Sequence, residues 1–300
     1  MPAERLQPGA TRPGPENAPA AAGFLEALRA VGPLRTVELR PPPAGLPGGR
    51  SVDAWIDLNQ NVRALLRDDR FVLFTDDAVG DREEESLRHL TANLGPGADL
   101  SRVIPFLTCK HTLDYCLLFA RRAASHGLGA MTVTGGDQDV GPPRCVPRSR
   151  DLRRIVREHA PELPLGTWVN PYRDPVEQVD LLMDPEHHAD YYLTQVVSHH
   201  DLAPLEGFLA EAERRGLETP GLAGVFFFRS ANPKTLERLS NFIPVPVEAL
   251  TREFEGGASA EDVCARTVKA LEGIGADKVY IANLERGRAA ERLRAIEALL

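Results

Sequence analysis

Eight predicted strands, each followed by predicted helix, indicate an α/β protein folded as a single (β/α)8 barrel. Short apolar runs alternate with segments of helical periodicity, and no long linker separates any two units. Eight such units in a chain of 300 residues match the usual size of this barrel. A doubly wound open sheet is the alternative, but the glycine-rich turn that it needs after the first strand is absent, since residues 38–43 read ELRPPP.

The first 22 residues are rich in Pro, Ala and Gly and offer little to bury, so we expect a disordered tail at residues 1–22. The barrel is expected to occupy residues 23–300, beginning with a short helix that carries Phe24, Leu25 and Leu28. The predicted strands are residues 34–39, 71–75, 103–108, 130–134, 165–169, 191–197, 223–228 and 278–282.

Helices are expected where apolar residues recur at spacings of three and four. Thr112 is predicted to cap the helix after the third strand, which Gly127 ends, and Asp201 to cap the helix after the sixth strand, which Gly216 ends. The remaining helices are predicted at residues 52–67, 82–94, 149–159, 247–254, 260–273 and 286–300, with two more beginning near residue 175 and after residue 232.

Composition excludes several classes of function. A net charge of −8 and a pI near 5.6 argue against binding to nucleic acid or an anionic membrane, because both need clustered Lys and Arg. No apolar run is long enough to span a bilayer, and the N-terminus lacks a signal-peptide pattern, so a cytoplasmic protein is expected. The four cysteines form no CxxC pair and are interpreted as small buried apolar residues.

Polar residues follow most of the predicted strands, at the end of the barrel where ligands bind. Glu38 is the strongest candidate, because a carboxylate between a strand and a proline run has few local backbone groups to cap. Asp137 follows the glycine pair that ends the fourth strand. The full set at this predicted mouth is Glu38, Thr75, Asp76, Asp77, Cys109, His111, Asp137, Asp139, Asn170, Gln195, His199, Arg229 and Asn283.

The segment VELRPP at residues 37–42 resembles the Phe-Glu-Phe-x-Pro-Pro opening of the methylenetetrahydrofolate reductase family. Other similarities follow in the same order along nearly the whole chain after the tail. They are the turn at Thr75, Leu107-Thr108-Cys109, Gly136-Asp137, Thr194-Gln195, the segment 242–246 and Asn283-Leu284.

This resemblance implies an enzyme of one-carbon metabolism that reduces 5,10-methylenetetrahydrofolate to 5-methyltetrahydrofolate, with NADH or NADPH reducing a bound FAD. Carried over by position, Glu38 is the general acid that assists opening of the five-membered ring of the folate. Asp137 lies near the flavin and the pterin, Gln195 orients the folate, and Thr75 contacts the isoalloxazine. A raised pKa of Glu38 is expected, because an acid catalyst must be protonated.

The chain departs from the family at positions that serve FAD. The departures are Gly135 for arginine, Phe106 for histidine, Asn170-Pro171 for His-Pro, and the absence of lysine from residues 182–190. Asn170, Arg173 and His187 are the residues expected to contact the cofactor in their place, with His188 as a further candidate. A flavin-independent enzyme that passes hydride directly from the nicotinamide is therefore an alternative.

Two other classes remain open. A metal-dependent barrel enzyme is one, because Asp76, Asp77, Asp137, His199 and His200 are suitable ligand types. A non-catalytic relative that binds folate but has lost the cofactor site is the other. The expected partner in each folate-related case is a small molecule, and a homo-oligomer is compatible with the sequence.

Overall fold

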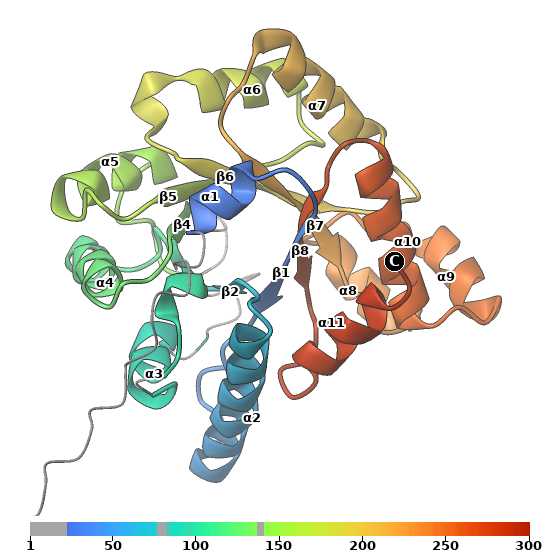
Figure 1. The fold of residues 1–300 in the computed structure, drawn as a ribbon, viewed down its shortest axis with the longest axis horizontal. Helices are drawn as coiled ribbons and strands as arrows, with labels where there is room; N and C mark the ends of the chain where they lie inside the picture. The colour runs from blue at the N-terminus through green and yellow to red at the C-terminus, as the bar shows by residue number, and fades with distance from the viewer. Residues whose placement is uncertain (1–22, 77–82, 84, 96, 137–140) are drawn as a thin grey trace, which may run out of the picture.

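A closed barrel of eight parallel strands forms the centre of the molecule (Figure 1). The computed structural model describes residues 23–76, 83, 85–95, 97–136 and 141–300, so the predicted tail lies outside the described residues. Strands adjacent in sequence are adjacent in space, and β1 pairs with β8 to close the barrel. The predicted (β/α)8 fold is confirmed. The strands are β1 Leu34–Leu39, β2 Val72–Phe74, β3 Val103–Thr108, β4 Met131–Thr134, β5 Leu165–Val169, β6 Tyr191–Val197, β7 Gly221–Phe226 and β8 Lys278–Ala282.

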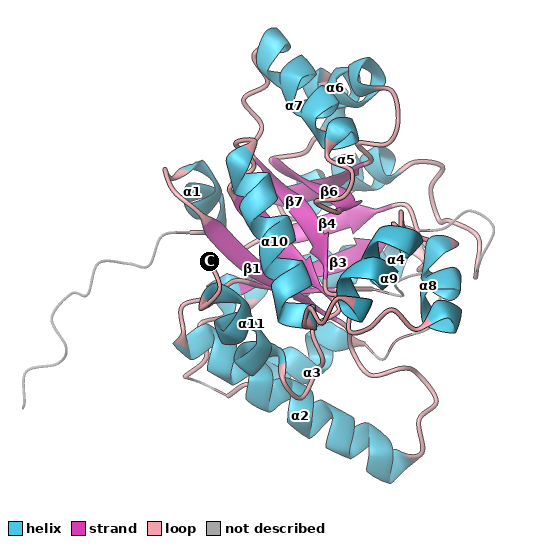
Figure 2. Cartoon of the chain, turned by 90° about the vertical axis from the view of Figure 1, so that its right-hand side faces the viewer, coloured by secondary structure: helices cyan, strands magenta, loops and turns pink. Residues whose placement is uncertain are grey.

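Helices surround the strands on the outside of the barrel (Figure 2). They are α1 Phe24–Arg29, α2 Gly48–Arg67, α3 Ser86–Asn93, α4 Leu113–Ser125, α5 Ser149–His159, α6 Pro175–Met183, α7 Ala203–Arg215, α8 Pro233–Ser240, α9 Val247–Glu255, α10 Ala260–Gly273 and α11 Ala289–Glu297. Single 3-10 turns occur at Leu100–Arg102 and Pro185–His187. No helix in the described part of the chain is both long and apolar enough to cross a membrane.

Local capping chemistry explains where several helices begin and end. The Thr112 side chain accepts a hydrogen bond from the Tyr115 amide, and Gly216 ends α7 with a left-handed φ of 68°, as predicted. The predicted cap at Asp201 is wrong. The Asp201 amide instead donates to the Ser198 carbonyl at 3.0 Å, which closes a turn, and α7 begins after Leu202.

Other boundaries differ because tertiary pairing decides them. Strand β7 begins at Gly221, two residues earlier than predicted. The ring of Tyr192 packs so closely against Gly221 that a Cβ at this position would lie 2.1 Å from the ring. Helix α3 begins at Ser86 rather than at residue 82, and α11 begins at Ala289 rather than at residue 286.

The core has two layers, because alternate residues of each strand face opposite sides. One set packs against the helices, and the other fills the barrel interior with large side chains such as Tyr191 and Tyr280. At the end opposite α8 and α9, helix α1 covers the barrel (Figure 2), with the Phe24 ring 5.1 Å from the rings of Phe71 and Tyr191. The four cysteines are free thiols, and three of them are buried, as predicted.

Candidate active site

Glu38 points into the barrel from the carboxyl end of β1. Its neighbours Val37 and Leu39 are fully buried against the helices, so the alternation of the strand directs Glu38 to the opposite side. The side chain lines a cavity of about 450 Å³, which is within the usual range for a small-molecule site. The side chain is half-buried.

The surroundings of Glu38 favour its protonated form. Burial raises the pKa of Glu38 from 4.5 to about 7, the negative charge of Glu83 adds to this rise, and Arg40 opposes it. A carboxyl group with a pKa near neutrality can donate a proton at physiological pH. The structure therefore gives Glu38 the property that a general acid needs.

Glu83 is a buried second carboxylate that sequence reasoning missed. It accepts hydrogen bonds from Arg40 Nε at 2.8 Å and from the Thr75 hydroxyl at 3.0 Å, and its side chain is only 3% exposed. A short antiparallel bridge with Pro43 holds its backbone beside the end of β1. The sequence predicted residue 83 to lie in a helix, and nothing distinguished Glu83 from the acidic residues around it.

Asp76 connects the ends of β2 and β3 and does not contact His199 or His200, with which it was predicted to bind a metal ion. One carboxylate oxygen accepts from the Thr108 amide at 2.6 Å, and the other lies 2.8 Å from His111 Nε2. His199 and His200 instead lie next to Glu253. Asp77 and Asp137 are outside the described residues. The described members of the predicted metal set are therefore split between two places.

Gln195 lies where β6 has an irregular register between Leu193 and Val196. Its Oε1 accepts a hydrogen bond from the Val196 amide at 2.9 Å, and its Nε2 donates to the Phe242 carbonyl at 3.4 Å. The side chain is half-buried and connects β6 to the segment between α8 and α9. Irregularities of this kind reorient side chains near active sites.

Aromatic rings pack together in the barrel interior, and Tyr280 is the one that the charge of Glu38 affects. Tyr280 is fully buried, donates to the Thr194 carbonyl at 2.6 Å, and has a pKa raised by burial and by the charge of Glu38. The half-buried Trp168 ring lies 6.1 Å from the ring of Tyr280 and 6.4 Å from that of Phe106. These rings fill the core of the barrel, and none of them lines the cavity of Glu38. The sequence showed these residues only as apolar members of strands.

Arg144 occupies the space that the missing side chain of Gly135 leaves. A Cβ at Gly135 would lie 2.9 Å from the Arg144 guanidinium carbon, and Arg144 donates to the Gly136 carbonyl. The aliphatic part of Lys110 packs against Gly136. Two cations thus adjoin the glycine pair that precedes Asp137.

The described residues that were expected to hold FAD lie apart from the cavity of Glu38. The Thr75 hydroxyl is hydrogen-bonded to Glu83, Asn170 Oδ1 accepts from the Tyr172 amide at 3.1 Å, and Arg173 is exposed. His187 is buried, with its Nε2 3.0 Å from Arg153 and 3.1 Å from the Thr167 hydroxyl.

Burial and Arg153 lower the pKa of His187 to about 3, so this ring stays neutral and carries no charge for a phosphate. None of these four side chains lines the cavity of Glu38. The position of a bound FAD therefore stays a prediction.

No known protein-family model and no curated protein matches this chain. The chain is similar in structure to a protein from Clostridium thermocellum that binds two copies of 5-methyl-5,6,7,8-tetrahydrofolic acid, with a TM-score of 0.64 and 15% identity over 89% of this chain and 94% of that one. It is also similar to an F420-dependent secondary alcohol dehydrogenase in complex with an F420-acetone adduct, with a TM-score of 0.51 and 12% identity over 88% of this chain and 99% of that one. At these identities the likeness shows the barrel fold.

Proposed function

We propose that this protein reduces a methylene-bearing tetrahydrofolate to the methyl form, using hydride from NADH or NADPH, at the mouth of the barrel. The observation that carries the proposal is Glu38, which lines the cavity and whose raised pKa of about 7 suits a proton donor. The ordered motifs around Glu38, Thr75, Asp137 and Gln195 support a folate substrate. A structural neighbour that binds 5-methyltetrahydrofolic acid adds support from a protein of the same fold.

In the proposed reaction, Glu38 donates its proton to the leaving nitrogen of the five-membered ring as the bond between that nitrogen and the methylene carbon breaks. The iminium that results accepts hydride from the reduced nicotinamide at the same carbon, which becomes the methyl group. Glu38 then regains a proton from solvent through the cavity. The hydride passes directly from the nicotinamide to the folate, so no step of this mechanism runs through a flavin.

The cavity offers groups for the rest of the substrate. Arg40, Arg229 and Arg286 line it, and guanidinium groups bind carboxylates and phosphates well. They are proposed to hold the anionic parts of the folate or the nicotinamide nucleotide. Asp137 and Gln195 are proposed to hydrogen-bond the pterin, since one accepts and the other both donates and accepts.

The test measures NADH and NADPH oxidation with 5,10-methylenetetrahydrofolate, with and without added FAD. The proposal predicts turnover without FAD and formation of 5-methyltetrahydrofolate. Glu38→Gln should abolish turnover while folate binding persists, because the amide keeps the shape of the side chain but cannot donate the proton. Glu218→Gln, at an exposed carboxylate, is the matched control.

Folate binding without turnover in the presence or absence of FAD would refute the reductase and favour the non-catalytic folate-binding relative. Turnover that strictly requires FAD would refute direct hydride transfer from the nicotinamide and favour the flavin-dependent reductase. Loss of folate binding in Glu38→Gln would show that Glu38 supports the structure of the mouth rather than the chemistry.

A further inference from the structure

Two imidazole rings lie side by side in the turn that follows β6. The Asp201 amide donates to the Ser198 carbonyl at 3.0 Å and closes the turn. The turn presents His199 and His200 with ring centroids 3.9 Å apart and planes tilted by 38°. Both side chains are mostly buried, at 15% and 17% exposure. Two imidazole rings this close together are stabilised when one neighbouring group contacts a ring nitrogen of each.

Glu253 on α9 is that partner. Its Oε1 lies 3.3 Å from His199 Nε2, and its Oε2 lies 3.1 Å from His200 Nε2. The three residues each offer one donor atom, and these atoms lie within 4.8 Å of one another. Two donors bound at about 2.0 Å to a tetrahedral ion would be about 3.3 Å apart. The observed separations are therefore compatible with donors around one small cation.

The hydrogen bonds of Thr267 assign the proton of His199. The Thr267 hydroxyl donates to the Val263 carbonyl at 3.2 Å, so its oxygen is left to accept from His199 Nδ1, which lies 2.8 Å away. In the neutral ring, Nε2 then carries a lone pair that faces the carboxylate of Glu253. A lone pair and a carboxylate that face each other repel unless a cation lies between them.

We propose that His199, His200 and Glu253 bind one divalent transition-metal ion of the Zn²⁺ type. Two imidazoles and a carboxylate are a known ligand set for this ion, and water can occupy a fourth position. Thr267 acts as the positioning residue that fixes the tautomer of His199, as outer hydrogen bonds do for metal-bound histidines.

The ion would join two parts of the chain that follow different strands. The histidines follow β6, whereas Glu253 on α9 and Thr267 on α10 belong to the long connection between β7 and β8. Arg266, which is about half exposed, also contacts Glu253 Oε1. A bound ion would compete with this guanidinium for the oxygen, and the side chain can turn toward solvent. The site therefore fastens α9 against the turn after β6.

The test uses the untagged full chain, titrated with Zn²⁺ by calorimetry and with Co²⁺ by visible spectroscopy. One equivalent of each ion should bind, Co²⁺ should give the intense bands of a tetrahedral site, and Zn²⁺ should raise the Tm. His200→Ala and Glu253→Gln should weaken binding at least tenfold. Thr267→Val should weaken it by about 10- to 100-fold, because it removes only the outer hydrogen bond.

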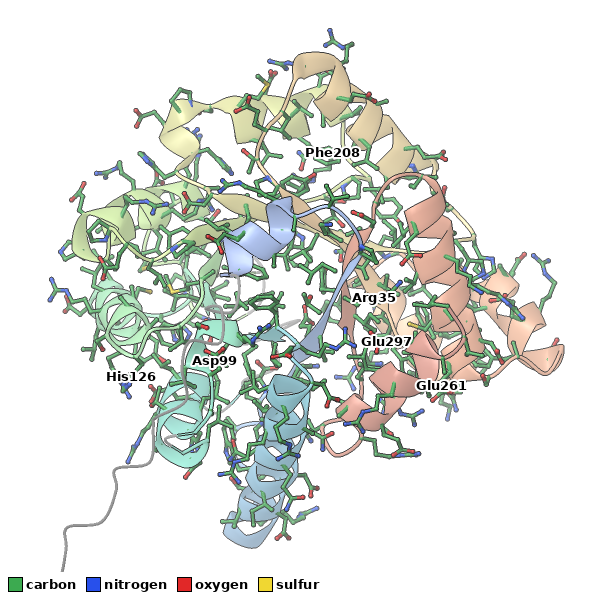
Figure 3. All side chains as sticks on the ribbon, viewed as in Figure 1. Arg35, Asp99, His126, Phe208, Glu261 and Glu297 are labelled. Atoms are coloured by element: carbon green, nitrogen blue, oxygen red, sulfur yellow. The ribbon has the colours of Figure 1, made fainter. Side chains whose placement is uncertain are left out.

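His126→Ala is the matched control, because His126 is exposed at the end of α4 (Figure 3), on the other side of the barrel from α9. It should bind both ions like the wild type. If the ligand variants fail to fold, X-ray absorption of the Co²⁺-loaded wild type decides by counting two imidazole ligands. Absence of one-equivalent binding, or binding that Glu253→Gln leaves unchanged, would overturn the proposal.

Discussion

Replacing Glu38 with Gln should stabilise the protein at alkaline pH and have little effect at acidic pH. The raised pKa means that the folded protein holds a proton on Glu38 that the unfolded chain releases between about pH 4.5 and 7. Stability is therefore lost as the pH rises through this window, and the loss is complete above the folded pKa. Glutamine has the same shape and no charge to bury, so the variant avoids the loss.

The difference between 4.5 and about 7 sets the magnitude. Each pH unit corresponds to about 1.4 kcal/mol, so the ionised Glu38 costs the folded protein up to about 3 kcal/mol above neutral pH. Relaxation of Arg40 and Glu83 around the charge reduces this figure. We expect a gain of about 2 to 3 kcal/mol for Glu38→Gln at pH 8.5 and below about 1 kcal/mol at pH 5.

Urea denaturation of both proteins across this pH range, followed by circular dichroism, measures the difference. All other titrating groups are shared, so their contributions cancel in the comparison. Glu218→Gln should show no pH-dependent gain, because its carboxylate is exposed. A gain for Glu38→Gln that is the same at pH 5 and pH 8.5, or none at all, would show that Glu38 ionises normally and would remove the basis for its role as an acid.

Three further predictions follow from neighbouring contacts. Glu83→Gln should move the alkaline decline of kcat/KM for folate reduction to lower pH, because it removes a negative charge that raises the pKa of Glu38; an unmoved profile would contradict the coupling. Arg153→Leu should cost about 2–4 kcal/mol in urea denaturation, because the fully buried guanidinium donates to two backbone carbonyls that would lose their partner. Gly166→Ala should cost about 1–3 kcal/mol, because a Cβ would lie 2.3 Å from a tyrosine ring in the barrel. Gly207→Ala is its control and should stabilise α7 by about 0.5–1 kcal/mol.

The position of Glu38 could be predicted because it depends on local chemistry. A strand alternates its faces, the prolines after residue 40 end it, and the barrel places strand ends at one mouth. The barrel itself was predictable for the same reason, since buried parallel strands appear as separate apolar runs. The start of β7 was not, because Gly221 pairs with Tyr192 of β6, and the sequence does not show which residues pair across strands.

The partners of the candidate residues could not be predicted. Glu83 acts on Glu38 only because the chain returns to the end of β1, and Glu253 meets the histidines from 53 residues away in sequence. Asp137 follows the glycine pair at the end of β4 in the sequence. It lies outside the described residues, so its role stays a prediction. The spacing of apolar residues shows which face of a helix or strand is buried. It does not show which distant side chain will contact that face.

The pairing of β1 with β8 has a consequence for synthesis of the chain. These strands are separated by more than two hundred residues, so the barrel cannot close until the ribosome has released β8. Until then the edges of β1 and β7 are both unpaired, and unpaired edges promote aggregation. Contacts of such long range also slow folding. A nascent or truncated chain that ends before Lys278 should therefore depend on chaperones far more than the complete barrel does.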